Sequence, residues 1–155
     1  SDYAAARAVN AALRTVTAVL PGELVRMVLD FAPLCYRIAA FTHLGTDVSV
    51  WGPGGRRQVL RRHAARILGF SFFPMGDRAL SWDEEGLAVI WDTISGVASR
   101  ELHHYRRVDC AAVFPDGRRV ATCTQPDRCF LWEAETGRVL RVLHLAASPD
   151  DILVD

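Results

Sequence analysis

Hydroxyl, imidazole and carboxylate side chains, the three groups of a nucleophilic hydrolase, occur together twice along this chain. The first set is His63, Ser81 and Glu85, and the second is His104, Thr122 and Asp127. In a hydrolase the imidazole takes the proton of the hydroxyl, and the carboxylate orients the imidazole. The same groups also build structural networks in protein cores, because a carboxylate fixes the imidazole tautomer and a hydroxyl can link two strands.

Other patterns that would carry catalysis or bind a metal are missing from the sequence. His103 and His104 are adjacent, and adjacent residues of a strand point to opposite faces, so the pair converges poorly on one ion. The sequence contains no CxxC pair, GxSxG elbow, P-loop or HExxH motif, the short signatures of metal, redox, hydrolase and nucleotide sites. We therefore expect no catalytic residue, no metal and no cofactor.

The spacing of the two sets favours the structural interpretation, because it belongs to an internal repeat. The tryptophans Trp51, Trp91 and Trp132 are 40 and 41 residues apart, and the histidines His63, His104 and His144 are 41 and 40 apart. A separation of 41 also relates Pro74 to Pro115, Gly76 to Gly117, Ser81 to Thr122 and Gly96 to Gly137. A constellation repeated in register with so many other residues is typical of repeat architecture.

Each repeat contains four short runs of strand-forming residues separated by Gly, Pro and Asp turns. The runs are 67–73, 78–82, 87–91 and 97–102 in one copy, and 108–114, 119–124, 129–132 and 139–143 in the next. Such runs predict a four-stranded antiparallel meander. A period near 41 residues with four strands is typical of a propeller blade.

The repeat resembles the WD-repeat family of β-propellers. The resemblance rests on Trp91-Asp92, Trp132-Glu133, the histidine that opens each repeat, and the Phe-Pro-Asp-Gly turn at 114–117. It implies a mainly β, partial propeller of four-stranded antiparallel blades over residues 35–155, in which Trp91 and Trp132 complete the two networks. The blades would be a partial one at 36–62, full ones at 63–103 and 104–143, and a partial one at 144–155. Because a propeller needs four to eight blades, we expect an oligomer, an open stack or a fragment of a longer chain.

Residues 1–34 differ from the repeats and predict two helices. The segment 3–19 is rich in Ala and has neither Gly nor Pro, and residues 23–31 place apolar side chains at helical spacing. The segment from Leu20 to Phe31 resembles the N-terminal part of an F-box. That resemblance implies that a ubiquitin-ligase adaptor would contact Leu20, Pro21, Leu24, Val28 and Phe31. The alternative is a two-helix cap on the first blade.

A partner protein would bind the turns of the blades. Aromatic residues and Arg carry much interface energy, and the candidates are Arg66, Trp82, Tyr105, Arg107 and Arg128. Nucleic acid is not expected, since 18 basic residues are balanced by 18 acidic ones. No apolar run approaches the length of a membrane helix. Free cysteines in a reducing compartment, cytoplasmic or nuclear, are expected, with a Cys123–Cys129 bridge as the alternative.

These observations predict a non-enzymatic protein-interaction module, a scaffold or adaptor built on WD repeats. The alternative is an F-box and WD-repeat substrate receptor of a ubiquitin ligase.

Overall fold

The computed structural model describes residues 15–20, 25–32, 35–42, 44–52 and 55–145, which form thirteen strands and no helix. The strands before the first full repeat are β1 (Thr15–Leu20), β2 (Val25–Ala32), β3 (Cys35–Thr42), β4 (Asp47–Trp51) and β5 (Arg57–Arg61). The next four are β6 (Ile67–Phe72), β7 (Arg78–Asp83), β8 (Leu87–Asp92) and β9 (Ala98–His103). The last four are β10 (Val108–Val113), β11 (Arg119–Thr124), β12 (Arg128–Glu133) and β13 (Val139–His144).

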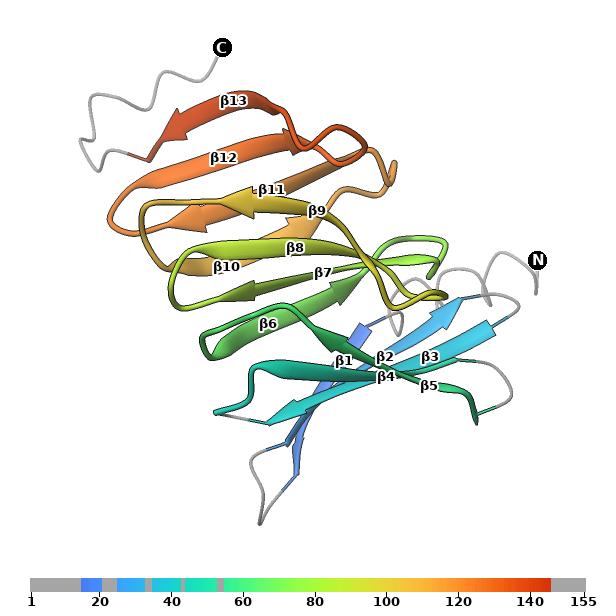
Figure 1. Cartoon of the computed structure of the whole chain (residues 1–155). Helices are drawn as coiled ribbons and strands as arrows, with labels where there is room; N and C mark the ends of the chain where they lie inside the picture. The colour runs from blue at the N-terminus through green and yellow to red at the C-terminus, as the bar shows by residue number, and fades with distance from the viewer. Residues whose placement is uncertain (1–14, 21–24, 33–34, 43, 53–54, 146–155) are drawn as a thin grey trace, which may run out of the picture.

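The strands form three antiparallel sheets in which neighbours along the chain are neighbours in space. The first sheet has the order β1-β2-β3-β4-β5, the middle sheet β6-β7-β8-β9 and the last sheet β10-β11-β12-β13. Figure 1 shows them as a stack in which the middle sheet lies between the other two. The mainly β architecture and the four-stranded meanders over residues 67–144 confirm the prediction from the repeat.

The first three strands of the middle sheet, β6 to β8, are rich in apolar residues and are buried on both faces. One face presents Phe70, Ala79 and Trp91 to a core shared with the first sheet. The opposite face presents Leu80 and Ile90 to a core shared with the last sheet. Successive residues of a strand point to opposite faces, so consecutive apolar residues such as those of β8 supply both cores.

The helices predicted for the first 34 residues are wrong wherever the structure describes that segment. Residues 15–20 form β1, and residues 25–32 form β2, which pairs along its whole length with β3 from Val25↔Thr42 to Ala32↔Cys35. The first sheet therefore has five strands and begins well before the partial blade predicted at 36–62. Residues 1–14 lie outside the described residues.

The adaptor-binding residues expected from the F-box resemblance also do not lie on a helix where the structure describes them. Leu20 lies in β1, whereas Val28 and Phe31 lie in β2, so the apolar helix on which the resemblance depends is replaced by strand. Pro21 and Leu24 fall outside the described residues, as does most of the partial blade predicted at 144–155. No helix in the described part of the chain is long and apolar enough to cross a membrane.

Candidate binding site

The His63 network is a buried chain of hydrogen bonds that joins the middle sheet to the loop before it. His63 Nδ1 lies 2.6 Å from Asp83 Oδ2, and His63 Nε2 lies 2.6 Å from Ser81 Oγ. The indole N–H of Trp91 donates to the same Ser81 oxygen over 2.8 Å. A carboxylate can only accept, so Nδ1 of His63 carries a proton and donates to Asp83. The two hydrogen bonds fix the orientation of the imidazole ring.

The carboxylate of this network is Asp83, so the assignment of Glu85 was wrong. Ser81 and Asp83 are two apart on β7 and share a face, whereas Glu85 lies beyond the end of the strand. Glu85 contributes only its backbone N–H, which donates to Asp83 Oδ1 over 3.0 Å, and Leu87 N–H donates to the same atom. Burial raises the pKa of Asp83, but the hydrogen bonds from His63 and these two amides outweigh it and leave the pKa lowered.

The His63 network is closed to substrates. Ser81 is 0% exposed, Asp83 1% and His63 6%. Ser81 Oγ accepts from Trp91 and is hydrogen-bonded to His63, so the atom that would be the nucleophile is enclosed by partners. The arrangement holds two strands and a loop together, as the structural interpretation requires.

The second network repeats this design without a carboxylate. His104 Nε2 lies 2.7 Å from Thr122 Oγ1, which accepts from the Trp132 indole N–H over 2.8 Å. The assignment of Asp127 was wrong, because His104 Nδ1 lies 2.9 Å from the backbone oxygen of Gly86 instead. Thr124 occupies the position 41 residues after Asp83 and is buried. Burial lowers the pKa of His104, and the hydrogen bond to Gly86 opposes that effect only in part.

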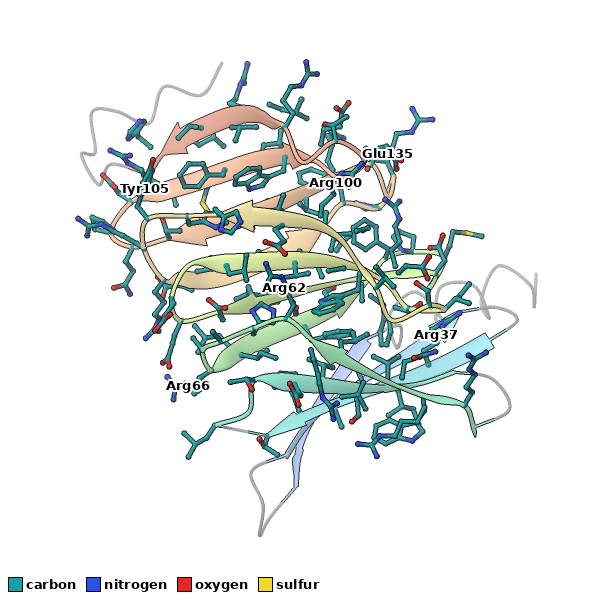
Figure 2. The ribbon with its side chains drawn as sticks, in the orientation of Figure 1. Arg37, Arg62, Arg66, Arg100, Tyr105 and Glu135 are labelled. Carbon is teal, nitrogen blue, oxygen red and sulfur yellow. A yellow bond between two sulfur atoms is a disulfide. The ribbon has the colours of Figure 1, made fainter. Side chains whose placement is uncertain are left out.

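One edge of the stack carries the turns β3–β4, β7–β8 and β11–β12 and the loops β5–β6 and β9–β10. We call it the turn edge, and it comprises residues 44–46, 62–66, 84–86, 104–107 and 125–127. The pairings Ile67↔Asp83 and Leu87↔His103 place a loop and a turn at the same end of the middle sheet. Figure 2 shows Arg66 and Tyr105 projecting from this edge, opposite Arg100 and Glu135.

Gly86 fixes the loop that carries Tyr105. Its carbonyl accepts from the backbone N–H of His104 over 2.8 Å as well as from the imidazole. Gly86 has a φ of +104°, and a Cβ atom there would lie 2.6 Å from the oxygen of His104 and 2.7 Å from that of Arg106. Only glycine fits this close approach of two backbones.

A pocket of about 290 Å³ opens on the turn edge of the last sheet. Its walls are residues 104–106, residues 124–128 and Phe130. Tyr105 is fully exposed beside it. Arg106 and Arg128 are exposed as well, and within the described part of the chain no ion pair holds either. The pocket thus combines two aromatic rings, a proline, two guanidinium groups and the single carboxylate of Asp127.

The five residues predicted to bind a partner do not lie at one site. Tyr105 and Arg128 line this pocket. Arg66 lines a second, shallower hollow on the turn edge and is paired with Glu84 over 3.2 Å. Arg107 is paired with Asp109 over 2.8 Å. Trp82 packs over Gly69 and against the core between the middle and last sheets.

The cysteines differ from the expectation of free thiols. Cys123 and Cys129 form a disulfide between β11 and β12, with Cα atoms 4.1 Å apart, and Cys110 is free and exposed. The bridge encloses residues 124–128, one wall of the pocket. The alternative pairing is therefore the one present in the structure.

No protein-family model and no curated protein matches the chain. Within the described residues, no three His, Cys, Asp or Glu side chains are grouped to hold a metal ion. Functional assignment therefore depends on the geometry of the turn edge.

Proposed function

We propose that this chain is a non-enzymatic protein-interaction module of the WD-repeat type, in which each sheet is a propeller blade and the turn edge holds a partner. The pocket between residues 104–106 and 124–128 carries this proposal. Its exposed tyrosine and two arginines fit an acidic, extended segment of a partner protein, because guanidinium groups bind carboxylates and aromatic residues anchor interfaces.

The packing of the sheets supports the propeller part of the proposal. The most extensive backbone contacts across sheets join β2 with β6, and β10 with β6 and β7. Each sheet thus approaches its neighbour most closely through its early strands. In a propeller, the first strands of the blades gather around the central axis and the last strands lie outside.

The two competing functions are less well supported. A propeller-based hydrolase would need an accessible nucleophile, and Ser81 is enclosed in the core. A ubiquitin-ligase receptor was suggested by a helix over residues 20–31, and β2 occupies most of that segment. The interaction module needs neither feature.

A display library of random peptides tests the proposal and requires no assumption about the identity of the partner. Selection on the wild-type chain should enrich peptides rich in Asp and Glu. Tyr105→Ala and Arg128→Ala should each weaken their binding by about tenfold, the loss of roughly 1.4 kcal/mol of contact energy. Arg118→Ala is the matched control, since this exposed arginine lies in the β10–β11 turn at the opposite end of the same sheet.

Equal binding by all three variants, or no enrichment of acidic peptides, would contradict the proposed site. A thermal melt of each variant should overlay that of wild type, because the three side chains are exposed.

A further inference from the structure

Three cysteines of the last sheet stand in one row across three adjacent strands. Cys110 of β10 is opposite Cys123 of β11, and Cys123 is opposite Cys129 of β12. Directly opposite residues of an antiparallel pair share a face, with Cβ atoms about 4.5–5.5 Å apart. The middle cysteine therefore has a sulfur neighbour on each side.

The row lies on the face of the last sheet that points away from the middle sheet. On β12, Phe130 and Trp132 pack toward the middle sheet. Cys129 directly precedes Phe130, and successive residues of a strand point to opposite faces, so Cys129 points away from the middle sheet. Cys110 is exposed, whereas Cys123 and Cys129 are half-buried. The free thiol is thus the member of the row that is most accessible to solvent.

The repeat does not require cysteine at these positions. The residues 41 positions earlier are Gly69, Trp82 and Ala88, which form the matching row Gly69↔Trp82↔Ala88 in the middle sheet. There the Trp82 ring covers Gly69 and fills the core. Where the middle sheet has packing residues, the last sheet has three cysteines that can take part in thiol–disulfide exchange.

We propose that Cys110 exchanges with the Cys123–Cys129 disulfide and so acts as a switch on the pocket wall. The Cys110 thiolate attacks Sγ of Cys123, a Cys110–Cys123 bond forms, and the Cys123–Cys129 bond breaks. Cys129 leaves as a thiolate and takes up a proton, while the proton of Cys110 goes to solvent. The number of disulfides is unchanged, so no oxidant or reductant enters the step.

The linear order of the row favours this direction of attack. Cys110 and Cys129 lie on strands at opposite sides of Cys123, so the backbone order of the row is nucleophile, central cysteine and leaving cysteine. Cys129 is one strand further away and is not a direct target. The attack therefore has one geometric outcome.

The consequence concerns residues 124–128, which the present disulfide encloses and which line the pocket. After exchange the link joins β10 to β11, and this turn is no longer closed by a covalent bond. A looser turn presents Arg128 and Pro126 less rigidly. This consequence rests on the proposed function of the pocket, whereas the exchange itself does not.

Disulfide mapping tests the exchange independently of any partner. The full chain is held at about pH 8 without reductant, quenched with acid, alkylated, digested and analysed by mass spectrometry. We expect two forms, one with Cys123–Cys129 and alkylated Cys110, and one with Cys110–Cys123 and alkylated Cys129. Alkylation of Cys110 alone would overturn the proposal.

Two variants keep the test decisive. Cys129→Ser treated with oxidised glutathione should form Cys110–Cys123, and Cys110→Ser should keep Cys123–Cys129 as its sole bridge. Free thiols at both positions of Cys129→Ser, or a bridge to Cys35 or between chains, would overturn the exchange. The amides of Thr124, Gln125, Asp127 and Arg128 should exchange hydrogen about tenfold faster in Cys129→Ser than in Cys110→Ser. Equal exchange rates would overturn the switch on the pocket wall, even if the peptide selection succeeds.

Discussion

The imidazole of His63 donates a hydrogen bond from Nδ1 to the carboxylate of Asp83 over 2.6 Å, with both side chains almost completely buried. The matching histidine of the next repeat, His104, donates to the backbone oxygen of Gly86. One repeat therefore orients its histidine with a charged side chain, and the next uses a neutral backbone group. The first arrangement concentrates several hydrogen bonds on a single carboxylate.

Removing that carboxylate should destabilise the fold strongly. Asp83→Ala leaves the Nδ1–H of His63 and the amides of Glu85 and Leu87 without their acceptor. A buried donor without a partner costs about 1–3 kcal/mol, so we expect a loss of about 3 kcal/mol in the free energy of unfolding, measured by urea denaturation.

Glu85→Ala is the control for this prediction, because Glu85 is exposed. Its substitution should change stability by less than about 0.5 kcal/mol. A larger loss in Glu85→Ala than in Asp83→Ala would show that the network is assigned to the wrong acid. If Asp83→Ala does not fold, Asp83→Thr gives a milder variant, since Thr124 occupies the matching position.

The strands of the two full repeats could be predicted from the sequence because their signals are local and repeated. Val25–Ala32 shows where this fails. Its apolar residues fit a helical face, but Val25, Met27, Leu29 and Phe31 also alternate with other residues, as in a strand. Pairing with β3, a contact made along the whole strand, decides between the two periods. The sequence alone does not show that partner.

The site could be predicted only in part, for a similar reason. Tyr105 and Arg128 were found because aromatic and Arg residues in turns are conspicuous. Asp83 was missed although its two-residue spacing from Ser81 places both on one face of a strand. Gly86 carries no side chain, and its role as the acceptor for His104 depends on how two backbones approach.

Stability should fall in mild acid because the partial burial of His104 favours its neutral form. Burial holds its pKa below the ordinary value of 6.5, so the unfolded chain binds the proton more readily. The contribution of His104 is fully present above about pH 6.5 and is lost as the pH falls through the lower folded-state pKa. Urea denaturation between about pH 7.5 and 5 should therefore show a smaller slope in His104→Gln than in wild type.

His103→Gln is the matched control, since His103 is its neighbour but has an exposed side chain. This variant should keep most of the pH dependence of wild type, because the charge of His103 contributes less than burial to the lowered pKa of His104. Identical slopes in wild type and His104→Gln would mean that His104 does not carry the effect.

Replacing Gly86 should move the loop that carries Tyr105. A Cβ at residue 86 would lie 2.6 Å from the backbone oxygen of His104, and this backbone cannot rotate away as a flexible side chain could. Gly55 also has a positive φ, +75°, but a Cβ there would meet nothing within 4 Å. We expect Gly55→Ala to cost about 1 kcal/mol for the backbone conformation alone. Gly86→Ala should cost at least about 1 kcal/mol more and weaken peptide binding at the pocket. Equal costs by urea denaturation would contradict the close approach.

Two of the repeated tryptophans, Trp51 and Trp132, should differ in their contribution to stability. Trp132 is 6% exposed, donates to Thr122 and lies in the core between the middle and last sheets. Trp51 is only half-buried, with the guanidinium of Arg57 5.7 Å from its ring centre. Trp132→Ala creates a cavity and leaves a hydroxyl with one partner fewer, so we expect a loss of about 3–5 kcal/mol.

Trp51→Ala should cost less than Trp132→Ala, because part of the Trp51 ring already faces water and its removal leaves no closed cavity. Urea denaturation of both variants measures the difference. A larger loss in Trp51→Ala would mean that the first sheet, despite its departure from the four-stranded repeat, holds the better-packed tryptophan. That result would place the main core between the first and middle sheets, where Phe70, Phe72 and Trp91 already meet.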